Sequence, residues 1–178
     1  MSKVALVVGH RQGAQGAWGS AGISEFTFNT KLAIDIKKRF GDEVKIFFRD
    51  DLPGGYGEKM KRLHKKIDSW GADYSISLHF NAVSNVSVAG HEVLYCSKSG
   101  KELASLLNNN FEKFLKTKNR GIKKRSKGER GGGFLCRGKS VCVIAEPFFA
   151  PHQHLYVDGT SGYDNLISAY VKTIKGIL

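Results

Sequence analysis

Long apolar runs are missing from this sequence. The run that opens the chain, Val4–Val8, has five residues, whereas a membrane helix needs roughly 18 and the core of a signal peptide roughly 7–15. We therefore expect no membrane span and no signal peptide, and we interpret Val4–Val8 as a buried strand. This interpretation implies that the protein is synthesised in the cytoplasm.

Cysteine is also scarce. The three cysteines, Cys96, Cys136 and Cys142, are odd in number and lack the spacing of a zinc knuckle. Cys136 and Cys142 flank the turn-like segment 137–140, so these two could lie near each other. The favoured interpretation is that all three are small core residues in a reducing compartment.

Acidic residues are few compared with basic ones. The chain has 28 Lys and Arg against 16 Asp and Glu, a net charge of +12. The stretch 116–139 holds ten basic residues and one acid, Glu129, and so carries +9 of that charge. Such a stretch attracts a polyanion, which can be nucleic acid, anionic lipid or an anionic wall polymer.

Three interpretations of the stretch 116–139 stay open. It can be a solvated charged loop without a role. Nucleic-acid binding is not expected, because the stretch lacks interleaved aromatic residues and any known binding motif. The third, favoured by the candidate catalytic site elsewhere in the chain, is a patch that binds an anionic polymer such as teichoic acid, another anionic glycan or lipopolysaccharide.

The order of apolar segments predicts an α/β fold. With 178 residues, of which 41% are hydrophobic, the chain suits a single domain over 1–178. Strand-like runs alternate with helical spacing, and Gly41 is expected to end the helix that Ser24 caps; 116–139 reads as a long Gly-rich loop. This alternation predicts a mostly parallel sheet with helices on both faces. The expected strands are 4–8, 44–48, 73–80, 88–96 and 141–145.

Four side chains are expected to meet at one edge of this sheet. Right-handed crossovers place every strand's carboxyl end on the same edge, where ligands bind in open α/β sheets. His10 follows the first strand, His79 ends the third, and Glu146 ends the strand 141–145, while Glu25 lies in a first helical turn. Two imidazoles, one carboxylate and an open position make a hydrolytic zinc site. Glu146, close to the metal but not bound to it, could serve as general base.

Each of these residues also has an ordinary structural explanation. A histidine at a strand end is often only hydrogen-bonded, and Glu25 could simply complement the helix dipole. Glu146 is harder to explain in this way, because a carboxylate after an apolar run is unfavourable unless it is paired.

Several segments match a known family in its order along the chain. The most specific are Ala72–Ala82 and Val143–Phe149; the others are Val7–His10, Ser24–Ala33, Arg49–Asp50, Gly90–Tyr95, Leu103–Ala104 and Arg120–Gly121. In these segments the chain resembles the zinc-dependent N-acetylmuramoyl-L-alanine amidases, which include bacterial cell-separation amidases and phage endolysins.

The resemblance implies an activity and a set of site residues. It implies a twisted sheet of about six strands, Zn²⁺ as cofactor, and cleavage of peptidoglycan between the lactyl group of N-acetylmuramic acid and L-alanine by zinc-activated water. The family's metal ligands correspond to His10, Glu25 and His79, and its catalytic glutamate corresponds to Glu146. These are the residues that the topology brings to one edge.

Two other functions are kept as alternatives. One is a different zinc peptidase or carboxypeptidase, and the other is a non-catalytic module that binds the wall or a polyanion. Glu146 argues against the second, since a binding module needs no buried base. Without a signal peptide or a separate wall-binding domain, the expected role is that of a phage endolysin or similar lysis enzyme, which acts on the wall after release.

The remaining polar candidates are expected to play supporting parts. Asn81 could orient His79 or bind substrate. His64 is expected to be solvated and His91 structural. His152 and His154 are expected to flank the cleft, with a second metal site as the alternative.

Overall fold

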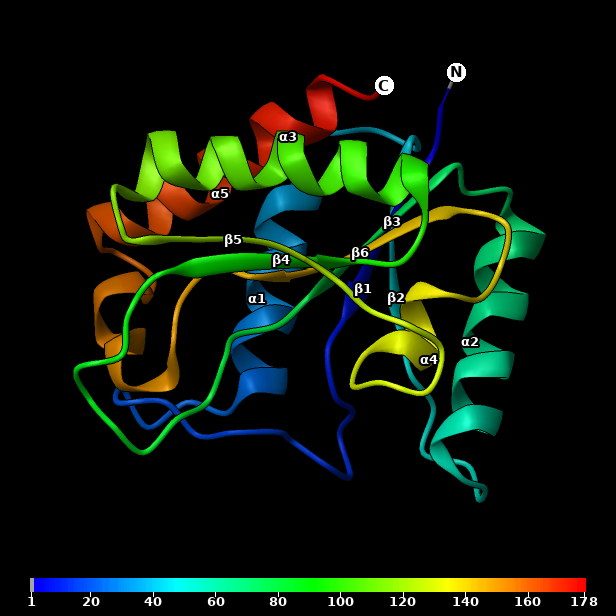
Figure 1. Ribbon diagram of the computed structural model, residues 1–178, viewed down its shortest axis with the longest axis horizontal. Coiled ribbons are helices and arrows are strands. Elements are labelled where there is room, and N and C mark those ends of the chain that lie inside the picture. The colour runs from blue at the N-terminus through cyan, green and yellow to red at the C-terminus, as the bar shows by residue number, and fades with distance from the viewer. Residues whose placement is uncertain (1) are drawn as a thin grey trace.

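The protein is built around one six-stranded sheet with helices on both faces (Figure 1). The computed structural model describes residues 2–178, and in it the strand order is β2-β1-β3-β6-β4-β5. This confirms the expected α/β fold. The strands are β1 Val4–Val8, β2 Val44–Phe48, β3 Tyr74–Leu78, β4 His91–Tyr95, β5 Asn119–Lys124 and β6 Val141–Glu146.

The strands run in two directions. β2, β1, β3 and β6 are mutually parallel, whereas β4 is antiparallel to β6 and carries β5 parallel to itself. The expectation that every strand's carboxyl end lies on one edge is therefore wrong for β4 and β5. As a consequence, Glu92 near the start of β4 lies opposite Glu146 at the end of β6.

The first strand shows how the core is divided between the two faces of the sheet. Val4, Leu6 and Val8 point into the larger core, and Ala5 and Val7 into the smaller one, as the two-residue period of a strand requires. Helices α1, α3 and α5 cover the larger core, while α2 and α4 cover the smaller one (Figure 1). The helices are α1 Glu25–Lys37, α2 Tyr56–Trp70, α3 Lys98–Leu115, α4 Gly132–Leu135 and α5 Ser161–Lys175, with a 3₁₀ helix, η1, at Ala150–Tyr156.

Helix α1 begins at the edge where the candidate site lies. The side chain of Ser24 caps the helix by accepting a hydrogen bond from the backbone N–H of Thr27, which satisfies one of the free amides of the first turn. Phe28, Leu32 and Ile36, four residues apart, form one buried face of the helix. The helix ends at Lys37, before the expected Gly41.

The basic stretch 116–139 is more ordered than the expected long loop. It contains β5 and the short helix α4. The strand escaped prediction because β5 pairs with β4 through backbone hydrogen bonds, which need no apolar side chains. Lysines on such a border strand also discourage pairing with another chain.

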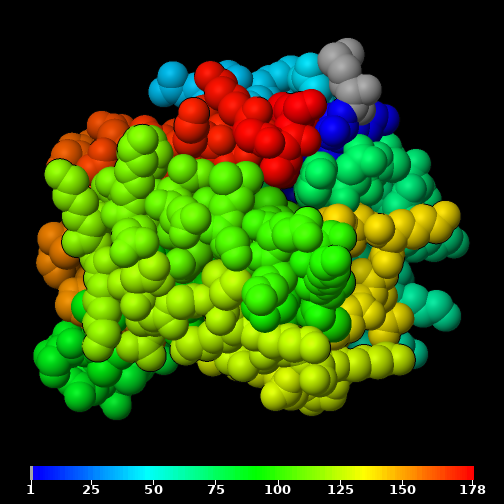
Figure 2. Space-filling model, turned by 45° about the horizontal axis from the view of Figure 1, so that its top comes forward, coloured from blue at the N-terminus to red at the C-terminus, as the bar shows by residue number. Residues whose placement is uncertain are grey.

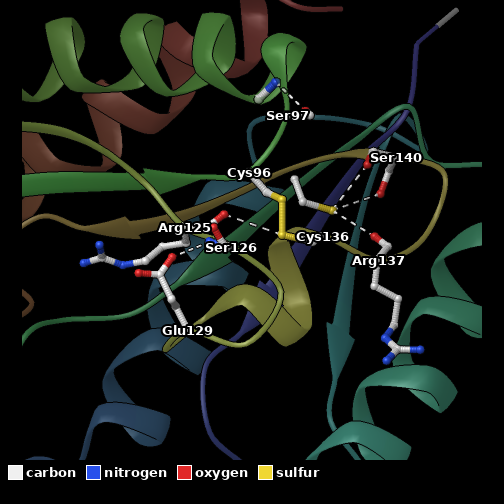
Figure 3. The surroundings of a disulfide bond; sticks show 10 residues. Cys96, Ser97, Arg125, Ser126, Glu129, Cys136, Arg137 and Ser140 are labelled. Carbon is white, nitrogen blue, oxygen red and sulfur yellow. Dashed lines mark hydrogen bonds between the residues drawn. A yellow bond between two sulfur atoms is a disulfide. The ribbon is translucent and has the colours of Figure 1, made fainter.

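Two of the three cysteines are joined, contrary to the expectation of reduced core thiols. Cys96 follows β4, Cys136 follows α4, and they form a disulfide with their Cα atoms 5.5 Å apart (Figure 3). Cys142 is a buried free thiol. The sequence concealed this pairing because 40 positions separate the partners, and only the packing of α4 beside the end of β4 brings them together.

Among the helices formed by residues 2–178, none combines the length and the apolar character needed to cross a bilayer.

Candidate active site

His10 follows β1 after Gly9, in an uncommon backbone conformation, and glycines pack against the rings of both His10 and His79. Its φ is 63°, in the left-handed region that few non-glycine residues occupy. A Cβ added to Gly9 would approach the His79 ring to 2.6 Å, and one added to Gly16 would approach the His10 ring equally closely. Each histidine ring therefore packs against the backbone of a glycine, where any larger residue would clash with the ring.

Glu25 lies between the two histidines. Its Oε2 is 2.9 Å from Nε2 of His10, and its Oε1 is 2.9 Å from Nδ1 of His79. Oε1 also accepts a hydrogen bond of 3.2 Å from the backbone N–H of Phe80. Burial by itself would raise the pKa of Glu25, but the hydrogen bonds from both histidines outweigh it and lower the pKa to about 2. Glu25 is therefore an ionised carboxylate in a buried position.

These three side chains have the composition and spacing of a metal site. One ligand atom from each of His10, Glu25 and His79 lies within 4.8 Å of the other two. Ligand atoms about 2.0–2.2 Å from a tetrahedral zinc ion are roughly 3.4 Å from one another, so a small adjustment would seat the ion. Two imidazoles and a carboxylate leave a fourth position open for substrate or water. The donor set thus fits Zn²⁺.

Glu146 ends β6 and is almost completely buried, with 4% of its surface exposed. Burial raises its pKa to about 7; the charge of His79 opposes this rise and that of Glu92 adds to it. Asn81 donates a hydrogen bond of 2.6 Å to Oε2, and Arg130 lies 3.8 Å from Oε1. A carboxylate with this pKa exchanges protons readily near neutral pH.

Glu92 is a site residue that the sequence reasoning did not single out. Asn81 Nδ2 lies 3.2 Å from its Oε1, so one amide bridges the carboxylates of Glu92 and Glu146. On the other side, Glu92 Oε2 accepts from Arg120 at 3.0 Å and from Lys123 at 2.8 Å. Burial would raise the pKa of Glu92, but these two cations outweigh it and lower the pKa. The motif Gly90–Tyr95 contained this residue, yet only an antiparallel β4 brings it to the site.

A cavity of about 440 Å³ extends from these residues. His10, His79 and Glu146 line one part of it, and α2 and α4 supply apolar walls through Met60 and Phe134. Residues 128–131 of the basic stretch form a further part of the lining. Other atoms of the stretch 116–139, yellow-green to yellow in Figure 2, lie on the outer surface of the face shown. The stretch is therefore both a wall of the cavity and a charged exterior.

The other histidines lie apart from the triad. His64, expected to be solvated, is 2% exposed and packs against Phe134, because the segment that carries α4 covers this side of α2. His91 is buried in the core, with Nδ1 3.0 Å from the hydroxyl of Thr117. His152 and His154 contact loops: Nε2 of His152 lies 3.1 Å from the carbonyl of Val88, and Nδ1 of His154 lies 2.8 Å from the hydroxyl of Ser20.

The sequence matches the profile of one protein family. A family profile described as N-acetylmuramoyl-L-alanine amidase matches residues 4–156. A search of curated proteins finds no match.

Solved structures share the fold over nearly their whole length. The catalytic domain of CwlV, an amidase from Paenibacillus polymyxa, superposes with a TM-score of 0.77 at 18% identity, covering 98% of this chain and 97% of that one. CwlD from Clostridioides difficile, solved in complex with the GerS lipoprotein, has a TM-score of 0.76 at 18% identity and coverages of 98% and 98%. The catalytic domain of the CD27L endolysin, which targets Clostridia difficile, has a TM-score of 0.72 at 26% identity and coverages of 99% and 97%.

Proposed function

Because this chain belongs to the N-acetylmuramoyl-L-alanine amidase family, we propose that residues 1–178 form one zinc-dependent catalytic domain. It hydrolyses the amide between the lactyl group of N-acetylmuramic acid and L-alanine in peptidoglycan. His10, Glu25 and His79 hold the metal, and Glu146 is the general base. The observation that carries this proposal is the mutual approach of the three ligand atoms within 4.8 Å, with Glu146 lining the same cavity.

The triad residues are suited to hold a divalent cation. Glu25 is ionised, as its pKa of about 2 requires, and it accepts a backbone hydrogen bond from Phe80 that fixes its orientation. Zn²⁺ bound there would polarise the scissile carbonyl and lower the pKa of water. A group that orients a metal ligand through such a hydrogen bond typically contributes a factor of about 10–100 to metal affinity or to activity.

Glu146 is positioned to move protons. It takes a proton from the attacking water and then delivers that proton to the nitrogen of L-alanine as the amide breaks. Asn81 holds Oε2 through a 2.6 Å hydrogen bond, so the other oxygen can serve the reaction. The pKa of about 7 suits both halves of this transfer, and a nearby divalent cation would favour the ionised form.

The test is digestion of purified peptidoglycan by the metal-free and zinc-loaded protein, followed by mass spectrometry. New L-alanine amino termini that depend on zinc are expected. A different cleaved bond would indicate a zinc peptidase or carboxypeptidase, and binding without cleavage would indicate a wall-binding module. His79→Ala should lose most of its zinc in elemental analysis, and full zinc occupancy in this variant would contradict the ligand assignment.

We further propose the role of a phage endolysin or similar lysis enzyme, produced in the cytoplasm, that reaches the wall after release and binds anionic polymer through 116–139. The similarity to the CD27L catalytic domain supports this role. Bacteria that express the protein should lyse when their membrane is permeabilised and not before. Intact cells after permeabilisation, despite active enzyme in the lysate, would contradict the lytic role.

A further inference from the structure

Arg49 lines the same cavity as the candidate catalytic residues. It directly follows β2, whose last residue, Phe48, lies beside Val8 at the end of β1. Since His10 comes two positions after Val8, the strand register brings the guanidinium to the same edge of the sheet as the metal triad. Arg49 belongs to one of the segments that resemble the family, but it is neither a candidate metal ligand nor the candidate base.

The side chain of Arg49 lacks the partner that a half-buried arginine normally has. Among residues 2–178, its Nε is buried and has no hydrogen-bond partner. The guanidinium lies over the ring of Tyr56, and its carbon is 5.7 Å from the ring centroid. An unsatisfied buried donor is unfavourable, more so when it is charged.

The nearest acidic residues in sequence are engaged by other arginines. Asp50 accepts two hydrogen bonds from Arg62, at 2.9 and 2.8 Å. Asp51 pairs with Arg11. Two carboxylates are thus shared among three arginines, and the one left over, Arg49, is the one that lines the cavity.

The surroundings favour an anion as the missing partner. Burial lowers the pKa of Arg49, but arginine stays protonated in proteins, so the positive charge persists in a cavity with apolar walls from Met60, Leu63 and Phe134. Guanidinium binds carboxylate through two parallel hydrogen bonds, and the interaction strengthens away from water.

The substrate's chemistry limits which carboxylate can be bound. The lactyl carboxyl is consumed in the scissile amide, and the two sugars carry no other acid. The carboxyl of L-alanine is consumed in the next peptide bond. The first free carboxylate therefore lies on the second residue of the stem peptide or beyond, on the leaving-group side of the bond.

We propose that Arg49 binds the free carboxylate of the second stem residue and thereby selects stems that carry an acid, rather than an amide, at that position. This rests on the amidase function proposed above. Arg49 would orient the peptide beside His10, Glu25 and His79, and the bound carboxylate would be the ionic partner that its guanidinium lacks among residues 2–178.

The experiment compares two muropeptides that are identical except for a carboxylate or a primary amide on the second residue. Wild-type protein should have the higher kcat/KM on the carboxylate form. Arg49→Gln should lower that value about 10–100-fold, the effect of one charge-assisted hydrogen-bond pair, and should change turnover of the amide form little. Arg49→Lys, which keeps the charge without the two-pronged geometry, should fall between. Zinc content should equal that of wild type in both variants.

Arg39→Gln is the matched control, because Arg39 is exposed and follows α1 beyond its carboxyl end; both rates should be unchanged. An equal loss on both muropeptides in Arg49→Gln would overturn the proposal, as would an unchanged preference. If the wild-type protein cleaved neither, the amidase function would fail separately. Calorimetric binding of the two muropeptides to wild type and Arg49→Gln would then still decide whether Arg49 distinguishes acid from amide.

Discussion

The two halves of the sheet contribute to the site in different ways. In the parallel half, β2-β1-β3-β6, the candidate site residues come at or just after the carboxyl ends of strands, as His10, His79 and Glu146 do. In the reversed half, β4-β5, the contribution comes from near the start of a strand, at Glu92. Strand direction therefore decides which end of a strand can reach the site.

The two halves also differ in chemistry. The parallel half supplies the metal-ligand candidates and the candidate base. The reversed half supplies a charged network in which Arg120 and Lys123 neutralise Glu92, and Asn81, which follows β3, links that network to Glu146. We infer that the first half carries the reaction and the second adjusts the protonation of Glu146. The predictions below test this division.

The largest effect is expected at Glu146. Glu146→Gln keeps the side-chain shape but cannot accept a proton, so kcat should fall about 10²–10⁴-fold. Because Glu146 lies outside the metal triad, zinc content should stay near one per chain by elemental analysis. Loss of zinc, or near-normal turnover, would show that the assignment of base and ligands is wrong.

The disulfide joins Cys96, just after β4, to Cys136, just after α4. It therefore links the reversed half of the sheet to the helix that covers the smaller core. Removing it in Cys96→Ala with Cys136→Ala should lower the free energy of unfolding by about 2–4 kcal/mol, since the loop of 40 residues is no longer closed. Urea unfolding measures this loss. A reducing agent should destabilise the wild type by a similar amount and leave the double variant unchanged; equal sensitivity of the two proteins would count against the bond.

A smaller effect is expected at Glu92. In wild type, activity should fall as pH drops through about 7 or somewhat below, since Glu146 with a raised pKa of about 7 loses its basic form there. Glu92→Gln removes a negative charge that raises the pKa of Glu146, so the acidic limb of the kcat/KM profile should move to lower pH. Asn81→Asp adds a negative charge between Glu92 and Glu146. This variant should move the acidic limb to higher pH. An unmoved limb in both variants would remove Glu92 from the proton-handling group.

The smallest effect is expected on the exterior of the basic stretch. Lys123 and Arg130 are unsuitable for this test because they contact Glu92 and Glu146, whereas Lys118, Lys124 and Lys127 are exposed. Changing these last three to Gln should weaken binding to purified walls, most clearly at low salt, and leave turnover of a soluble muropeptide unchanged.

The matched control changes three exposed lysines of α2, Lys61, Lys65 and Lys66, to Gln. The net charge then falls equally, but at another place. Equal loss of wall affinity in both triple variants would mean that overall charge, and not the stretch 116–139, attracts the wall. No loss in either would leave the stretch as solvated charge.

The two halves of the sheet also differ in how well the sequence predicts their strands. β1 and β6 of the parallel half were predictable because their continuous apolar runs mark strands buried on both faces, and a polar residue at the end of such a strand lies at the sheet edge. That reasoning reached His10 and Glu146, and the strand expected at 73–80 placed His79 at the same edge. It missed β5, whose residues Asn119–Lys124 are polar or basic apart from Gly121 and Ile122, because border strands are held by backbone pairing.

The sequence by itself determined the strand-helix alternation, the family and the three residues of the candidate metal site, because these depend on local apolar patterns and on motifs within short segments. Only the tertiary structure decided the reversal of β4, the pairing of Cys96 with Cys136, the burial of His64 and, among residues 2–178, the lack of an ion pair at Arg49. Each of these depends on which distant segments come into contact, and residue type along the chain does not encode contact directly. Strand direction is the clearest case, because the same five residues of β4 would place Glu92 far from Glu146 if the strand ran the other way.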